Sequence, residues 1–130
     1  MKRVLIVEDS VYVRLSIKSV IKKAGFETVG ETSFGRDVLK MVAQLNPDIV
    51  ILDNILPDIN GFDVLQELSV SPYRPKTVVL SALDHYSTIN KARKLGAAAY
   101  IKKPYEPQQL VEILNSVLIY PSPAKQYFPS

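Results

Sequence analysis

Short apolar runs alternate along the chain with segments of helical periodicity, and this alternation limits the fold more than any other feature. The runs lie at residues 4–7, 49–52, 78–80 and, more weakly, 97–101, with a further candidate strand at 26–33. The first three are rich in β-branched residues without polar alternation, as expected for parallel strands buried on both faces. The candidate at 26–33 alternates more and contains Gly30, so we expect it at the edge of the sheet.

Five further segments place apolar residues at helical spacing. They lie at about residues 13–24, 36–45, 61–69, 84–95 and 107–120. Gly25 and Gly96 follow two of these segments, and glycine is a common residue just past the end of a helix. We expect Asp84 to be the N-cap of the fourth helix. Repeated strand and helix units predict an α/β domain whose parallel sheet is covered by helices on both faces.

Polar residues follow the predicted strands at their carboxyl ends, where ligands bind in folds of this kind. The residues there are Glu8, Asp9, Ser10, Asp53, Ser81, Lys102 and Lys103. Carboxylates brought together repel each other, and a hard divalent cation such as Mg²⁺ relieves that repulsion. A cation beside a lysine forms an anion site, where an aspartate can act as a nucleophile and become an acyl phosphate.

Each of these residues also has an ordinary structural explanation. Acidic residues after a strand often begin a helix, where the helix dipole favours them. Asp53 precedes a loop with Pro57 and Gly61, which makes it a candidate turn residue. A serine in such a place is usually a cap, and surface lysines are mostly solvated. The functional interpretation is favoured because the fold brings all these positions to one edge of the sheet.

Over residues 2–120 the sequence resembles the receiver domains of two-component response regulators, which include the chemotaxis regulator. The matching motifs are V-E-D-S at 7–10, L-D-N-I-L-P-D-I-N-G at 52–61, L-S-A at 80–82 and Y-I-K-K-P-Y at 100–105. The resemblance implies a doubly wound, flavodoxin-like fold of five parallel strands in the order 2-1-3-4-5. We expect a receiver domain at 1–120 and, because residues 121–130 hold three prolines and no periodicity, a tail or linker stub there.

The resemblance implies a phosphoacceptor and a metal site. Asp53 corresponds to the residue that takes a phosphoryl group from a sensor histidine kinase or a phosphotransfer protein. The implied cofactor is Mg²⁺ or Mn²⁺, held by Asp9, Asp53, the backbone carbonyl of Ile55 and, through water, Glu8.

The resemblance also implies phosphoryl contacts and a switch. Ser81 and Lys103 contact the phosphoryl group, and Lys103 is preferred to Lys102 because it directly precedes Pro104. The Lys103–Pro104 bond is expected to be cis, which would point the lysine into the site. Tyr100 corresponds to a switch aromatic that turns inward when Ser81 moves toward the phosphoryl group, although it is also an ordinary residue for a strand edge.

The fourth helix, fifth strand and fifth helix form the implied output face, for a partner that the sequence does not identify. Lys91, Lys94 and Lys102 lie there and are candidates for docking an acidic or amphipathic segment, the alternative being an ordinary solvated surface. Residues 96–100 lack the acidic residues usual before the fifth strand of winged-helix regulators, so we do not expect their symmetric dimer.

The chain departs from the family pattern at three positions. Ile55 and Leu83 stand two residues after Asp53 and Ser81, where the family's residues flank the path of the hydrolytic water. Apolar residues at both positions predict slow self-dephosphorylation. Asn54 stands where an apolar residue is commoner, and the sequence offers no account of it.

Composition argues against several other classes of protein. The 130 residues include no cysteine, and a net charge of +3 is too dispersed to indicate direct binding of nucleic acid. No apolar stretch is long enough to span a bilayer, and we expect no membrane partner and a cytoplasmic location. A flavodoxin-like cofactor binder needs a first loop that cradles phosphate, and Glu8 and Asp9 would repel it. An aspartyl-phosphate hydrolase would need an acid where Ile55 stands.

The sequence therefore predicts a signalling phosphoacceptor rather than a turnover enzyme, although it would promote its own phosphorylation and dephosphorylation. A receiver-like interaction module that is never phosphorylated stays the alternative. The kinase, the input signal and the oligomeric state stay open. Also open is whether this is a stand-alone receiver or part of a longer regulator.

Overall fold

The computed structural model describes residues 2–119, 128 and 129 and shows every predicted strand and helix in the predicted order. The strands are β1 (Lys2–Val7), β2 (Phe26–Thr32), β3 (Ile49–Asp53), β4 (Lys76–Ser81) and β5 (Ala99–Lys102). The helices are α1 (Val11–Lys23), α2 (Val38–Leu45), α3 (Gly61–Ser69), α4 (Tyr86–Lys94) and α5 (Pro107–Ile119), with a 3-10 turn, η1 (Gly35–Asp37), before α2.

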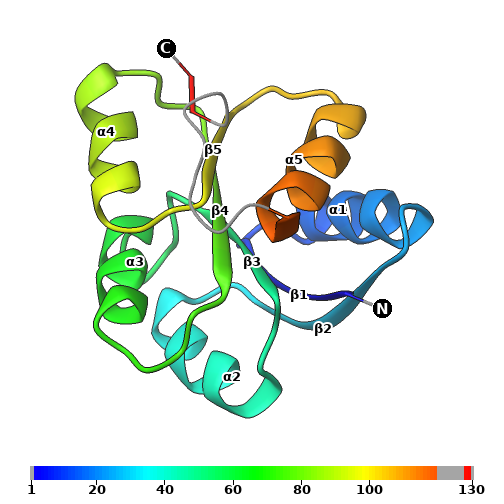
Figure 1. The fold of residues 1–130 in the computed structure, drawn as a ribbon, viewed down its shortest axis with the longest axis horizontal. Helices are drawn as coiled ribbons and strands as arrows, with labels where there is room; N and C mark the ends of the chain where they lie inside the picture. Colours follow the sequence, from blue (N-terminus) through cyan, green and yellow to red (C-terminus); the bar gives the residue numbers. More distant parts are fainter. Residues whose placement is uncertain (1, 120–127, 130) are drawn as a thin grey trace.

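The strands form a parallel sheet in the order β2-β1-β3-β4-β5, which confirms the predicted topology and places β2 at an edge. Helices α1 and α5 cover one face of the sheet, and α2, α3 and α4 cover the other (Figure 1). Because all strands run in the same direction, their carboxyl ends lie at one edge of the sheet. The residues that follow β1, β3, β4 and β5 are therefore neighbours.

The sheet centre is buried on both sides, which explains its uninterrupted apolar runs. All five residues of β3 are buried, as are the apolar residues of β1 and β4. Ile17 and Ile21 of α1 and Leu114 of α5 are buried on one side, with Val64 of α3 and Ile89 of α4 on the other. This packing fixes the strand ends relative to one another.

The loop between β3 and α3 approaches the start of α3 very closely. The backbone N–H of Gly61 donates to the carbonyl of Asn54 at 2.8 Å. A Cβ at position 61 would lie 2.9 Å from the backbone oxygen of Asp53 and 2.9 Å from the Cα of Asn54. The side chain of Asn60 caps the helix by accepting from the N–H of Asp63 at 3.0 Å. Glycine at 61 thus lets the helix hold the loop that follows Asp53.

The predicted start of the fourth helix is wrong. Helix α4 begins at Tyr86, and His85, which makes no side-chain capping bond, is its N-cap. Asp84 instead forms an ion pair with Lys102, whose Nζ lies 3.1 Å from its carboxylate. The carboxylate of Asp84 thus faces a partner on the neighbouring strand and does not cap the helix. A sequence pattern cannot show such a partner.

The second helix also begins differently from its prediction. The backbone N–H groups of Gly35 and Arg36 donate to the carboxylate of Asp58 at 2.9 and 3.0 Å. These bonds hold the start of the segment as η1, and regular α-helix follows from Val38. Asp58 lies on a distant loop, so local periodicity could not indicate this change.

The predicted tail at 121–130 lies mostly outside the described residues, which include only Phe128 and Pro129 of it. Tyr120, the predicted end of the last helix, also lies outside them. The domain boundary at residue 120 therefore stays a prediction. Among the helices that the structure describes, none has the length and apolar character needed to cross a membrane.

Candidate functional site

Three carboxylates meet at the carboxyl edge of the sheet. One carboxylate oxygen from each of Glu8, Asp9 and Asp53 lies within 4.8 Å of the other two. Glu8 and Asp53 are buried, whereas Asp9 is exposed. The group is therefore a shallow site with two sheltered acids and one that faces solvent. Such an oxygen donor set suits Mg²⁺, which keeps several waters and needs few protein ligands.

Lys103 completes this cluster from the end of β5. Its Nζ lies 3.0 Å from Oδ2 of Asp53 and 3.7 Å from Oε1 of Glu8. The peptide bond between Lys103 and Pro104 is cis, as the resemblance implies. The neighbouring Lys102 points to Asp84 instead. The structure thus brings Lys103, and not Lys102, to the carboxylates of Glu8 and Asp53.

The electrostatics of the cluster show that its negative charge is incompletely balanced. The pKa of Glu8 is raised from 4.5 to about 7. Burial is the largest cause, followed by hydrogen bonds with Asp53 and Asp9 and the negative charge of Asp53. Glu8 therefore tends to hold a proton that a divalent cation would displace. This behaviour fits an acidic site that needs a metal to be fully ionised.

The two oxygens of Asp53 have different partners. Oδ1 accepts a hydrogen bond from the backbone N–H of Ile55 at 3.0 Å, while Oδ2 faces Lys103. The carboxylate is thus held by one donor from its own loop and one from β5. The predicted role of the Ile55 carbonyl as a metal ligand is not tested by any contact in the structure and stays a prediction.

Ser81 lies at the end of β4 and is buried beside the acidic cluster. Its Oγ accepts from the backbone N–H of Leu83 at 3.0 Å and from Nδ2 of Asn54 at 3.4 Å. The second contact gives Asn54 a role that the sequence did not indicate. Its buried amide links the residue after Asp53 to the hydroxyl predicted to contact the phosphoryl group.

Tyr100 already points into the protein in this structure, the orientation that was expected only after the switch, and it connects to Ser81 through one residue. Its ring is 1% exposed, and its hydroxyl donates to the carbonyl of Leu83 at 2.8 Å. Because the N–H of Leu83 donates to Ser81, a chain of two hydrogen bonds joins Tyr100 to the site. Burial raises the pKa of the Tyr100 phenol, so it stays protonated and able to donate.

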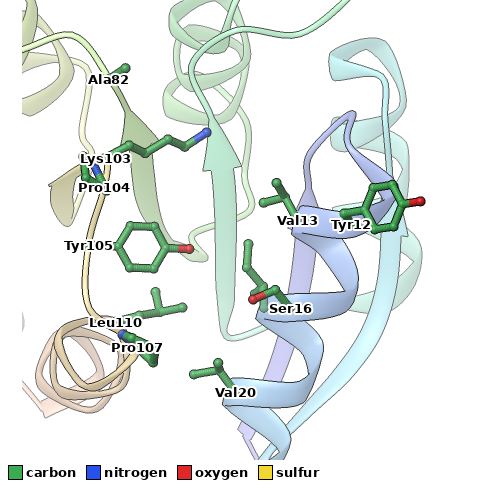
Figure 2. Close-up of a pocket in the computed structure, with 11 residues that line it drawn as sticks. Tyr12, Val13, Ser16, Val20, Ala82, Lys103, Pro104, Tyr105, Pro107 and Leu110 are labelled. Carbon is green, nitrogen blue, oxygen red and sulfur yellow. The ribbon is translucent and has the colours of Figure 1, made fainter.

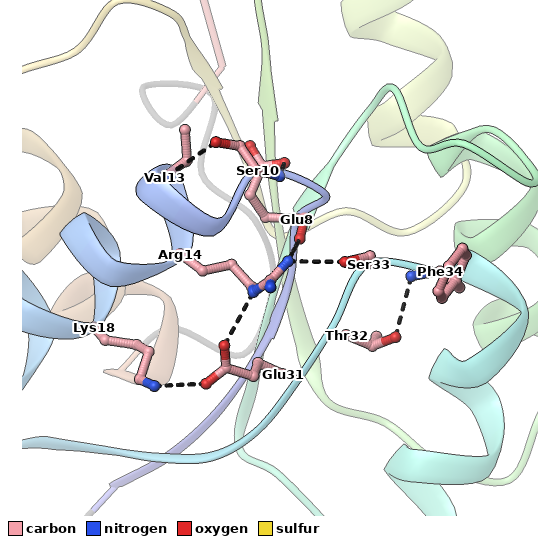
Figure 3. Close-up of polar contacts among 9 residues, drawn as sticks. All are labelled: Glu8, Ser10, Val13, Arg14, Lys18, Glu31, Thr32, Ser33 and Phe34. Carbon is pink, nitrogen blue, oxygen red and sulfur yellow. Dashed lines mark hydrogen bonds and ion pairs between the residues drawn. The ribbon is translucent and has the colours of Figure 1, made fainter.

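Arg14 holds the loop that carries the acidic residues, and the sequence analysis missed it. Its guanidinium donates to the carbonyl of Glu8 at 2.5 Å, to Oγ of Ser33 at 2.8 Å and to Glu31 at 3.0 Å (Figure 3). Lys18 also pairs with Glu31, at 2.6 Å, and its hydrogen bond is the main cause that lowers the pKa of that carboxyl. The network joins α1 to the ends of β1 and β2.

An apolar groove opens beside the cluster, between α1 and α5, with a volume of about 630 Å³. Tyr105 and Leu110 face Val13 and Val20 of α1 across it (Figure 2). Lys103 also lines the groove, which places its opening next to Asp53. Burial raises the pKa of Tyr105, and the charges of Glu8 and Asp53 add to the effect. Tyr105 is thus another residue at the site that the sequence analysis did not single out.

The three lysines predicted for the output face are exposed. Lys102 pairs with Asp84, and the Nζ of Lys91 lies 5.0 Å from the centre of the Phe62 ring. Lys94 lies at the end of α4. The structure places all three on α4 and β5, but no contact in it tests their role in binding a partner.

Comparison with known proteins gives concordant results. A family model described as the response regulator receiver domain matches residues 4–115. The chain is 40% identical over 116 residues to the chemotaxis protein CheY of Thermotoga maritima, covering 89% of this chain and 97% of that protein. It is 30% identical to CheY of Bacillus subtilis, with the same coverage. The crystal structure of the BeF3-activated N-terminal receiver domain of RstA from Klebsiella pneumoniae superposes with a TM-score of 0.84 and 26% identity, covering 92% of this chain and all of that one.

Proposed function

Because the chain belongs to the response regulator receiver domain family of two-component signalling, we propose that it takes a phosphoryl group on Asp53 with the help of Mg²⁺. The observation that carries this proposal is the placement of Lys103 Nζ 3.0 Å from Asp53, inside a cluster of three carboxylates. A sensor histidine kinase or a phosphotransfer protein is the proposed donor, and the cytoplasm the proposed compartment. The protein then acts as a signalling phosphoacceptor.

The proposed transfer forms one bond to phosphorus and breaks another. A carboxylate oxygen of Asp53 bonds to phosphorus while the donor's leaving atom departs with the electron pair, which yields an acyl phosphate. Forming this mixed anhydride removes the negative charge of the Asp53 carboxylate, so the ammonium of Lys103 becomes free to bind the phosphoryl oxygens. Lys103 thus stabilises the nucleophile before the transfer and the phosphoryl charge during it.

Asp9 and Asp53 are the proposed direct metal ligands, and the backbone carbonyl of Ile55 is the third protein ligand. Glu8 is proposed to bind the metal through a water molecule. Bound Mg²⁺, or Mn²⁺ in its place, would supply positive charge beside the phosphoryl oxygens. The raised pKa of Glu8 and the exposure of Asp9 support this assignment, because the site gains full ionisation and stays open to water.

The hydrogen bonds from Ser81 to Tyr100 suggest how phosphorylation reaches the output face. A phosphoryl oxygen on Asp53 would attract the Ser81 hydroxyl, which now accepts from the N–H of Leu83. Movement of that loop would in turn act on Tyr100, which donates to the carbonyl of Leu83. We therefore assign the switch to Ser81 and Tyr100, and its output to a partner on the face of α4, β5 and α5.

Beryllium fluoride, a mimic of the acyl phosphate, provides a test that needs no kinase. With Mg²⁺ and fluoride present, we expect the melting temperature to rise by roughly 10 °C when the ligand reaches about 100 times its dissociation constant. Mg²⁺ without beryllium fluoride, or beryllium fluoride without Mg²⁺, should not give this rise in melting temperature. The variant Asp53→Asn should show no rise with both present. A wild-type protein that shows no combined effect would support the alternative, an interaction module that is never phosphorylated.

The lifetime of the phosphoryl group tests the two apolar rim positions. The side chains of Ile55 and Leu83 are 65% and 38% exposed, so polar replacements there can reach an attacking water. Ile55→Asn with Leu83→Glu is expected to shorten the phosphoryl half-life at least about tenfold, because the new groups can orient that water. The measurement is the decay of the phosphorylated mass after the donor is removed. Val70→Asn, at another exposed apolar position, is the control, and an unchanged half-life in the double variant would contradict this account.

A further inference from the structure

Phe128 is buried against the output face although it lies beyond the end of α5. Its side chain is 6% exposed and packs with the hydrophobic core. Phe128 and Pro129 line a cavity of about 400 Å³ together with Tyr100 of β5 and Ile113 of α5. Figure 1 shows this C-terminal end, in red, close to β5 and on the side of α4. A residue predicted to belong to a tail thus contacts the face through which the domain is proposed to signal.

Arg93 of α4 also contacts Phe128, in addition to the residues of β5 and α5 that lie beside it. The Cζ of its guanidinium lies 4.7 Å from the centre of the Phe128 ring, a cation–π distance. The Nε of Arg93 is buried and has no hydrogen-bond partner among the residues that the structure describes. The ring therefore covers the guanidinium where a polar partner would otherwise be needed. All three elements of the output face contribute to holding one phenylalanine.

We propose that Phe128, in the described part of the C-terminal tail, is a built-in ligand of the output face. In this arrangement Phe128 occupies the position beside Arg93, Tyr100 and Ile113, here called the pocket, that an aromatic side chain of the output partner would take. The partner must displace it, and the cavity of about 400 Å³ lies next to this position. The inference rests on the proposed function only in treating the face of α4, β5 and α5 as the output surface. It does not depend on the chemistry of Asp53.

Tethering makes this competition effective. Because Phe128 belongs to the same chain as the face it contacts, its effective concentration there is near the millimolar range, and a free ligand must compete with it. If the tail occupies the pocket about nine-tenths of the time, a competing ligand binds about tenfold more weakly than to an open pocket. The tail thus sets a threshold that a partner's affinity must exceed.

The charge of the face indicates what kind of partner can exceed that threshold. Lys102 lines the cavity and, like Lys91 and Lys94 of α4, is exposed, whereas residues 121–130 contain one lysine and no acidic side chain. The side chains of this segment therefore offer these lysines no carboxylate. A partner segment with a phenylalanine and nearby aspartates or glutamates would gain charge attraction that the tail lacks. We assign the displacing partner to this class of acidic, phenylalanine-bearing segment.

The experiment uses the full chain and a labelled peptide with the sequence of residues 121–130. We expect the peptide to bind Phe128→Ala about tenfold more tightly than the wild type, because only the variant leaves the pocket open. Phe34→Ala is the matched control, since Phe34 is 49% exposed beside η1, and it should bind like the wild type. A peptide in which alanine replaces the phenylalanine should not bind. Equal binding to Phe128→Ala and the wild type, or no binding to either, would overturn the proposal.

NMR spectra provide a second measurement, which detects weak binding of the peptide. The same spectra show whether each variant is folded. In the full chain, Phe128→Ala should shift the signals of Arg93, Tyr100 and Ile113, and the peptide added in trans should move them back toward their wild-type positions. Shifts confined to the sequence neighbours of residue 128 would overturn the proposal. The comparison is made without a phosphoryl donor, so its failure would leave the proposed function of Asp53 unaffected.

Discussion

Replacing Lys103 by alanine is expected to slow phosphoryl uptake from acetyl phosphate by about 100-fold or more, the usual effect of losing a preorganised charge in an active site. The Nζ of Lys103 lies 3.0 Å from Asp53, and its side chain is only 29% exposed. Solvent therefore replaces this charge poorly when the side chain is removed. The rate is measured as the appearance of the phosphorylated mass with time, at saturating Mg²⁺.

Lys102→Ala is the matched control for this prediction. Lys102 is adjacent in sequence and has the same charge, but its side chain is 50% exposed and pairs with Asp84. Such an exposed ion pair contributes little, so we expect the phosphorylation rate of this variant to stay within about twofold of the wild type. Similar losses in both variants would show that net positive charge matters rather than the position of Lys103. An unchanged phosphorylation rate in Lys103→Ala would contradict the proposed role of Lys103.

Replacing Gly61 by valine is expected to lower the free energy of unfolding by about 2–3 kcal/mol, in the range of overpacked positions. A Cβ at this position would lie 2.9 Å from the backbone of both Asp53 and Asn54, and backbone cannot move aside as a flexible side chain can. The small gain in helix propensity on replacing glycine does not offset this collision. Because the collision displaces the loop after Asp53, phosphoryl uptake should also slow.

Urea denaturation of Gly61→Val and Glu67→Val tests this expectation. Glu67 lies on the same helix and is exposed, so introducing the same side chain there should change stability by no more than about 0.5 kcal/mol. The result is the shift of the denaturation midpoint at an unchanged slope. Equal midpoints for the two variants would contradict the close approach of α3 to the Asp53 loop.

The sequence was sufficient to predict the sheet and the cluster of acids because both depend on strong, local signals. Strands buried on both faces produce continuous apolar runs, as β3 shows, and a parallel sheet necessarily brings the ends of its strands together. The prediction that Asp9, Asp53 and Lys103 converge followed from the topology, and the structure brings them together. The choice of Lys103 over Lys102 depended on the family resemblance.

The features that the sequence did not predict are contacts between distant residues. Asp84 was expected to cap α4, but Lys102 on a neighbouring strand takes its carboxylate. Arg14 holds the loop of Glu8 through partners on β2 and beyond it, with no periodic signal in its own helix. Phe128 lies in a segment whose composition is that of a tail, and only the tertiary structure shows its burial.

The central claim is that Asp53 accepts a phosphoryl group in a metal-dependent reaction, and intact-mass measurement tests it most directly. The 130-residue chain is incubated with acetyl phosphate and Mg²⁺, with parallel samples that contain EDTA or the variant Asp53→Asn. The account predicts that the wild type gains one phosphoryl group and that both controls gain none. A wild type that binds Mg²⁺ yet gains no mass, or an equal gain in Asp53→Asn, would contradict it.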